Sequence, residues 1–246
     1  MVVMIQQASC STITYSWAAS DVYKRHVSFI AFSSYLQAAT LDYRHEYADR
    51  TRINKDRIAI IEKLPNGIGF YVDASVKSGG VDGEQDKHLS DLVANAIELG
   101  VSYNYKVTDN FILQPGFIFE SGPDTSIYKP YLRVQYNFDS GVYMAGRYRY
   151  DYARKTANYS DDEKTNRFDT YIGYVFDELK LEYNFTWMDS DQIKFDNKKT
   201  NYEHNVALAW KLNKSFTPYV EVGNVAVRNN TDERQTRYRV GLQYHF

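Results

Sequence analysis

The sequence has no long hydrophobic run. No stretch of its 246 residues approaches the roughly 20 consecutive apolar residues that a transmembrane helix needs, so a helical membrane protein is excluded. Proline is scarce, with five residues, and the mean hydropathy is -0.54. Aromatic residues are nevertheless abundant, with 23 tyrosines and 13 phenylalanines. The chain is therefore aromatic without being apolar along its length.

Strong charge and cysteine are also missing. The formal net charge of -2 argues against a nucleic-acid-binding protein. Cys10 is the only cysteine, and it falls in a segment that we expect the mature protein to lack. A mature chain without disulfides fits a reducing compartment or an outer-membrane barrel that closes on itself. We expect no cofactor.

The N-terminal segment is typical of a secretory signal. Basic residues at Lys24 to His26 precede an apolar stretch, Val27 to Leu36, and small residues follow it. We predict cleavage after Ala38, which makes residues 1–38 the signal segment and 39–246 the mature chain. Met1 to Tyr23 lies upstream of the basic residues, so we expect a mis-assigned start, with the true one near Val22. The alternative for the whole segment is a disordered tail.

The last eleven residues form the clearest strand pattern. Tyr238, Val240, Leu242 and Tyr244 alternate with polar or small residues. This period of two predicts a strand with one apolar face, which a lipid bilayer would cover. The terminal Phe246 also resembles the sorting signal by which the assembly machinery recognises bacterial outer-membrane barrels.

The same alternation recurs in twelve segments. Connections of two to five residues alternate with longer ones, as the short periplasmic turns and long outer loops of outer-membrane barrels do. We therefore predict an all-β fold, a twelve-stranded antiparallel transmembrane β-barrel with both ends periplasmic. A soluble β-sandwich is the alternative, although tyrosines at strand ends favour a membrane interface. The segments are 40–47, 57–61, 70–77, 95–105, 113–120, 128–138, 142–152, 166–176, 179–187, 201–212, 216–223 and 236–246.

Basic residues on the polar face of these strands fall into two groups. In a ring of twelve strands the groups lie on opposite sides, with inward acids such as Glu98, Glu120, Glu182, Glu203 and Glu221 between them. We name Arg44, Arg57, Arg237 and Arg239 the first basic sector, and Lys129, Arg133, Arg147, Arg149 and Arg167 the second basic sector.

Two facing basic sectors would hold an extended polyanion, because arginine binds carboxylates with two parallel hydrogen bonds. The alternative is that each arginine pairs with an inward acid and braces the barrel; Asp42, Asp73, Asp151 and Asp169 are the expected partners. Inward tyrosines could stack on sugar rings, namely Tyr71, Tyr131, Tyr143, Tyr171 and Tyr219.

Several segments resemble the oligogalacturonate-specific porin family. They are Tyr43 to Tyr47, Lys55 to Arg57, Tyr128 to Arg133, Thr217 to Asn224 and Thr231 to Gly241. The resemblance covers Ala39 to Phe246 and implies a monomeric, twelve-stranded outer-membrane channel for acidic oligosaccharides from pectin breakdown. A sister group, the N-acetylneuraminate porins, is similar in architecture and in its basic lumen. The anionic preference is therefore better supported than the sugar.

Two other classes of function compete with passive diffusion. An outer-membrane hydrolase would need Ser, His and Asn or Asp to converge. His204 beside Asn205 is the only candidate for such a site. A simpler interpretation makes His204 an outward interfacial residue. A structural barrel would be plugged by salt bridges. We expect a channel, with no catalysis and no metal site.

Overall fold

The computed structural model describes residues 39–78, 92–155 and 161–246. These residues form one antiparallel sheet and no helix that is long and apolar enough to cross a membrane. The strands are β1 (Thr40–Ala48), β2 (Asn54–Lys63), β3 (Ile68–Ser78), β4 (Leu92–Tyr103), β5 (Tyr105–Lys106), β6 (Phe111–Ser121), β7 (Thr125–Asn137), β8 (Val142–Lys155), β9 (Glu163–Phe176), β10 (Leu179–Ser190), β11 (Thr200–Trp210), β12 (Phe216–Ala226) and β13 (Arg234–His245).

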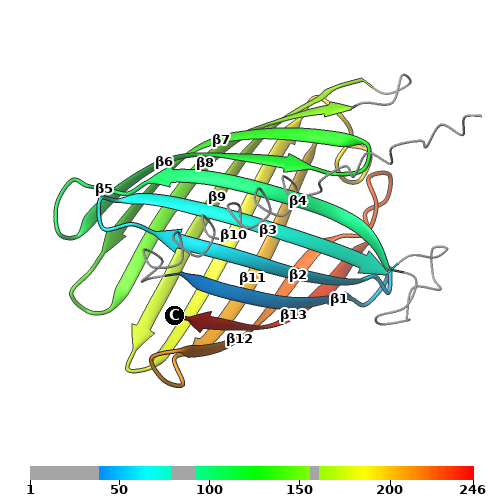
Figure 1. Cartoon of the computed structure of the whole chain (residues 1–246). Coiled ribbons are helices and arrows are strands. Elements are labelled where there is room, and N and C mark those ends of the chain that lie inside the picture. The colour runs from blue at the N-terminus through cyan, green and yellow to red at the C-terminus, as the bar shows by residue number, and fades with distance from the viewer. Residues whose placement is uncertain (1–38, 79–91, 156–160) are drawn as a thin grey trace, which may run out of the picture. The chain divides into compact units, whose positions relative to one another are not determined.

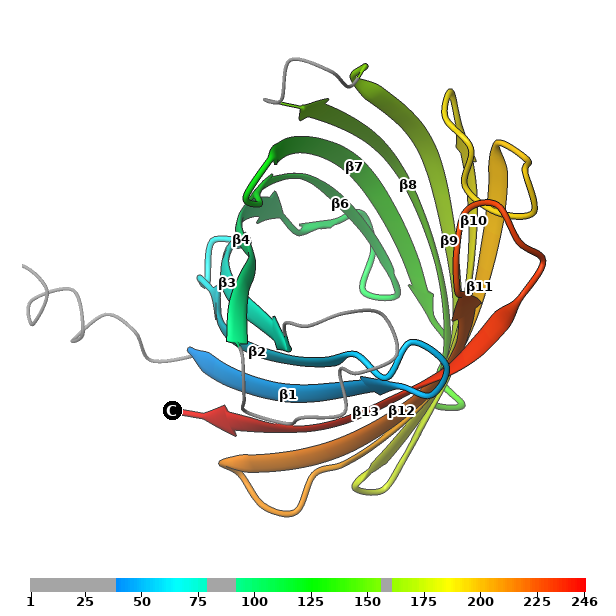
Figure 2. The ribbon, with the colours of Figure 1, turned by 90° about the vertical axis from the view of Figure 1, so that its right-hand side faces the viewer.

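The sheet closes on itself. Consecutive strands pair from β6 to β13, β13 pairs with β1, and β4 returns to β6 (Figure 1). The short β5 continues β4 and also pairs with β6. The thirteen labelled strands therefore occupy twelve strand positions around the barrel. Figure 2 shows the strands following one another around the ring. The predicted twelve-stranded antiparallel barrel is confirmed.

One predicted strand is interrupted. The segment 95–105 is split at Asn104, whose backbone N–H donates to the carbonyl of Gly67 in the β2–β3 turn at 2.8 Å. Tyr105 then resumes pairing, with Leu113 of β6. The break therefore leaves the ring closed.

The strands also extend beyond the predicted ends. The predicted 57–61 segment is the ten-residue β2, and the predicted loop at 121–127 shrinks to 122–124 because Ser121 pairs with Ser126. The predicted loop 153–165 is partly strand, since β8 reaches Lys155 and β9 begins at Glu163. The predicted signal segment, most of the 78–90 loop, and residues 156–160 lie outside the described residues. Ladder hydrogen bonds continue where the apolar face ends, so hydrophobic alternation marks only the lipid-facing part of each strand.

Alternation places apolar side chains outside and polar ones inside. Val206, Leu208 and Trp210 are 40 to 50% exposed, while Asp42, Asp73 and Asp169 are at most 4% exposed. A soluble core would reverse this order. The exposed apolar band is the surface that a bilayer would cover.

A lysine substitution on each face of one strand tests this orientation. Val206→Lys is expected to lower the free energy of unfolding by about 2–4 kcal/mol, because the charge would enter lipid near the middle of β11. Ala207→Lys is the matched control, since Ala207 borders a lumen hollow with Glu203 and Glu221. The measurement is denaturant unfolding in lipid vesicles. Equal losses in the two variants would contradict the assignment of faces.

Candidate functional site

All nine predicted basic residues lie on the face opposite the exposed apolar band. The strand order places the first basic sector on β13, β1 and β2, and the second on β7, β8 and β9. Three strands separate the two sectors on each side of the barrel: β3, β4 and β6 on one side and β10 to β12 on the other. The two sectors therefore face each other across the lumen, and what remains is how each charge is balanced.

Two basic groups of the second sector are fully engaged. Lys129 is 5% exposed, and its Nζ contacts Glu98 at 2.8 Å and Glu120 as well. Arg149 holds Asp151 through two hydrogen bonds of 2.6 and 2.7 Å, the bidentate geometry that guanidinium favours. Lys129 braces the wall across strands, as the alternative interpretation predicts, whereas Arg149 and Asp151 lie on the same strand.

Asp169 on β9 is shared by two arginines. Its Oδ2 accepts from Nε of Arg147 and its Oδ1 from Nε of Arg167, each at 2.9 Å. The hydroxyl of Thr186, on β10, donates to Oδ1 at 2.7 Å. Asp169 and Thr186 are the largest fully buried side chains in the described part of the chain. One carboxylate thus balances two guanidinium groups.

Arg239 and Arg237 of the first sector differ in their partners. Arg239 lies between Glu46 and Glu221 on the two neighbouring strands and contacts each at 2.6 Å. Arg237 donates to the amide oxygen of Asn205 at 2.8 Å, and its nearest carboxylate oxygens are 3.7 to 4.0 Å away. Arg239 is therefore held by ion pairs and Arg237 mainly by a neutral amide.

Arg57 also lies between two acids. Its guanidinium is 3.2 Å from both Asp42 of β1 and Asp73 of β3. With the contacts of Asp151 and Asp169, this confirms all four expected acidic partners.

Arg44 and Arg133 are the exceptions. Among the described residues, neither guanidinium has a carboxylate within 4 Å. Arg44 pairs in register with Arg57 and Gly241, so its direct cross-strand neighbours offer no acid. Arg133 donates to the side-chain oxygen of Gln135 at 2.8 Å. Each basic sector therefore contains one guanidinium without a carboxylate within 4 Å in the described part of the chain.

The surroundings of Arg133 add to its charge. It pairs in register with Arg147, which shares Asp169 with Arg167. Its guanidinium also lies 5.2 Å from the ring centre of Tyr171. Arg147 and Arg167 thus share one carboxylate, and Arg133 beside them contacts none within 4 Å among the described residues, so guanidinium groups outnumber carboxylates at this part of the wall.

Two lumen lysines were missed by the sequence interpretation. Lys55 borders an inner hollow with Arg44 and Arg57, and Lys180 contacts Glu182 at 3.1 Å. Lys55 lies before the predicted start of its strand. Alternation within the predicted 179–187 segment could have identified Lys180, because it lies two residues from the inward Glu182.

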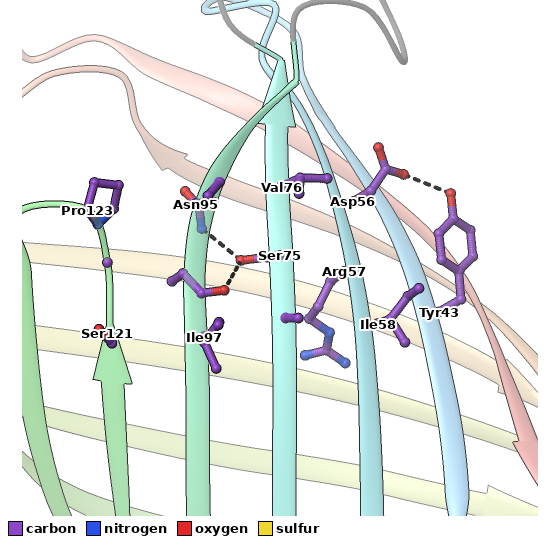
Figure 3. A pocket seen from close by; sticks show the side chains of 14 residues that line it. Tyr43, Asp56, Arg57, Ile58, Ser75, Val76, Asn95, Ile97, Ser121 and Pro123 are labelled. Atoms are coloured by element: carbon purple, nitrogen blue, oxygen red, sulfur yellow. Dashed lines mark hydrogen bonds between the residues drawn. The ribbon is translucent and has the colours of Figure 1, made fainter. Parts of the chain in front are cut away.

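The outer face carries a polar cluster on β1 and β2. Asp56 accepts a hydrogen bond from the Tyr43 hydroxyl at 2.7 Å (Figure 3). Asp56 also contacts Nδ1 of His45 at 3.0 Å. An adjoining hollow of about 600 Å³ is lined by apolar side chains such as Ile58 and Ile97. These belong to the outward set, whereas Arg57, Ser75 and Asn95 border both this hollow and the inner one beside Arg44.

His204 lies on the outer face, as the simpler interpretation predicted. Its ring is within hydrogen-bond distance of the Tyr183 hydroxyl, at 2.7 Å, and packs against Phe185 and Tyr202. No group of three or more metal-ligating side chains occurs in residues 39–78, 92–155 or 161–246.

A closed antiparallel barrel with an apolar outer band and a charged interior defines a class, the outer-membrane channel proteins. Within that class, residues 32–246 match the model of the family described as oligogalacturonate-specific porin protein (KdgM). The chain belongs to this family.

Several relatives are similar to this protein over most of its length. It is 39% identical over 210 residues to the uncharacterized protein YiiY of Salmonella typhimurium, covering 85% of this chain and 91% of YiiY. It is 36% identical over 217 residues to the oligogalacturonate-specific porin KdgM of Dickeya dadantii, covering 85% and 92%. The N-acetylneuraminic acid channel NanC of Escherichia coli K12 is 26% identical over 231 residues, covering 89% and 95%.

Solved structures show the same barrel. The KdgM porin superposes with a TM-score of 0.65 at 32% identity, over 84% of this chain and 99% of the porin. A second KdgM structure, described as a complex with disordered oligogalacturonate, gives the same TM-score at 33% identity and the same coverage. Membership of the family places this protein in the bacterial outer membrane, which its strands cross repeatedly.

Proposed function

We propose that this protein mediates passive, selective diffusion of acidic oligosaccharides across the outer membrane, with oligogalacturonates as its preferred cargo. The observation that carries the proposal is the pair of opposed basic sectors, each with one guanidinium that has no carboxylate within 4 Å among the described residues. Arg44 and Arg133 are these two groups. An extended sugar acid could place carboxylates toward both walls at once.

The pairing of the other basic groups supports diffusion over capture. A channel must attract an ion without holding it too tightly to release it. Most of the nine basic groups are paired with acids, so the cargo would meet only a few basic groups that are not already in ion pairs. We assign anion selectivity to the whole set of pore-lining groups, namely Arg44, Arg57, Lys129, Arg133, Arg147, Arg149, Arg167, Arg237 and Arg239.

A second candidate cargo is N-acetylneuraminate. The relative NanC, whose name assigns it this sugar, supports the alternative. Both sugars carry a carboxylate, but only an oligogalacturonate presents a series of them along one chain. Binding that strengthens with chain length would favour oligogalacturonates.

The protein also needs export and assembly partners. We propose that residues 1–38 direct secretion and that β13 is recognised by the assembly machinery through the terminal Phe246. That side chain is 67% exposed and its ring packs on Tyr244 at 4.9 Å. We propose a monomeric channel without catalytic activity.

Planar-bilayer recording tests the proposed function. Protein extracted from outer membranes is expected to form channels whose reversal potential in a salt gradient indicates anion selectivity. Added trigalacturonate should block the current more strongly than monogalacturonate or N-acetylneuraminate. Correctly folded protein that does not conduct would instead support a plugged structural barrel.

A further inference from the structure

Four of the inward tyrosines share one arrangement. Each pairs in register with a glycine on the neighbouring strand. Glycine weakens a strand interior and often marks a place where another group approaches closely. The pairs are Tyr71 with Gly100, Tyr131 with Gly116, Tyr143 with Gly173 and Tyr219 with Gly241.

The tyrosine rings occupy the space that the glycines leave. A Cβ atom on Gly173 would lie 2.1 Å from the ring of Tyr143, and one on Gly241 would lie 2.3 Å from the ring of Tyr219. No side chain fits at these positions unless the ring moves. The two rings therefore lie against the barrel wall, as aromatic groups do when they cover a glycine in a sheet.

Each ring then carries its hydroxyl past the glycine to a carboxylate. Tyr143 on β8 donates to Glu182 on β10, the residue paired with Gly173 from the other side. Tyr219 on β12 donates to Asp42 on β1 at 2.9 Å. In both cases the side chain spans one strand and ends on an acid of the lumen wall.

The orientation of these acids affects which ions can pass, because the proposed cargo is anionic. A carboxylate that turns toward the lumen repels an acidic sugar and attracts cations. Asp42 is 3% exposed and is also held by Gln243 at 2.9 Å. Among the described residues the other partner of Glu182 is Lys180, whose side chain is 46% exposed, so Tyr143 is the buried partner of this acid.

We propose that the pairs Tyr143–Gly173 and Tyr219–Gly241 preserve the anion selectivity that the basic groups give the channel. The glycine keeps the ring out of the passage, and the hydroxyl keeps the carboxylate turned toward the wall. This inference rests on the proposed function, because it explains how a lumen rich in acids accepts anions. Tyr143 is the better test, since Asp42 has further partners.

Tyr143→Phe separates charge from width. The ring stays over Gly173, so single-channel conductance should change little, whereas Glu182 loses its buried donor. The ratio of anion to cation permeability is expected to fall about two- to fivefold, less than the roughly tenfold that a whole hydrogen bond to a charged group supports, because Glu182 keeps Lys180 as a partner. Reversal potentials of membrane-extracted protein in a salt gradient measure this ratio.

Gly173→Ala changes both properties. The added methyl group pushes the ring into the lumen, so conductance and anion preference should fall together. Gly146→Ala is the matched control on the adjacent strand β8, because a Cβ there meets only Val134, at 3.9 Å. The control is expected to conduct as the wild type does.

The outcomes separate this inference from the proposed function. A wild-type protein that does not conduct anions would overturn the proposed function. An anion-selective wild type whose selectivity survives Tyr143→Phe would overturn only the inference. If Gly173→Ala does not fold, Tyr143→Phe alone decides, because phenylalanine keeps the ring that covers Gly173.

Discussion

Replacing Arg44 and Arg133 together by glutamine is expected to weaken trigalacturonate block by at least about tenfold, since one hydrogen bond between charged groups contributes roughly 1.5–3 kcal/mol. These two guanidiniums have no carboxylate partner within 4 Å among the described residues. A cargo carboxylate can therefore reach them without displacing an existing ion pair. The measurement is the concentration of trigalacturonate that halves the current through the channel.

The control variants separate free from balanced charges and the lumen from the loops. Arg149→Gln removes a guanidinium that is already bidentate with Asp151 and should weaken the block less. Lys198→Gln with Lys199→Gln changes the β10–β11 loop, where Lys198 pairs with Asp196 at 2.7 Å. If the loop variant reduces block as much as the double lumen variant, the selectivity resides at the outer mouth and not on the opposed walls.

Arg44 and Arg57 also show how much of the lumen the sequence could predict. Alternation alone identified Arg44 and Arg57 as inward, and the structure places both there. It could not show that Arg57 lies between Asp42 and Asp73, because those acids come from strands on either side and their contact depends on register. A shift of two residues would keep the same faces and change every partner.

The same limit applies to the outer face and to the glycines. Asp56 precedes the predicted start of its strand, and its partner Tyr43 comes from the neighbouring strand, so no local pattern reveals the cluster. Gly173 looks like a weak position in a strand until Tyr143 is placed over it. The lipid-facing half of the barrel is predictable because a bilayer imposes one simple rule. The lumen depends on pairwise contacts across strands.

Asp169→Asn is expected to destabilise the barrel and to strengthen its anion preference at the same time. The substitution leaves Arg147 and Arg167 close together without the carboxylate that they share. Breaking a buried ion pair costs about 3–5 kcal/mol, and we expect the lower end, about 3 kcal/mol, because water in the lumen can reach both guanidiniums. Their side chains are 20 and 22% exposed. Denaturant unfolding in lipid vesicles measures the loss, and reversal potentials measure the preference.

Asp151→Asn is the matched control, because Asp151 serves one arginine and its side chain is 17% exposed, against 0% for Asp169. Its loss should be about 1 kcal/mol, typical of a partly solvated pair. Equal destabilisation of the two variants would mean that Asp169 is no more than another lumen brace. A larger loss for Asp169→Asn, with a rise in anion preference, would show that Asp169 stabilises the barrel and lowers the positive potential of this wall. Arg133 lies beside this ion-pair cluster without a carboxylate partner among the described residues, so its positive charge would remain able to attract the cargo.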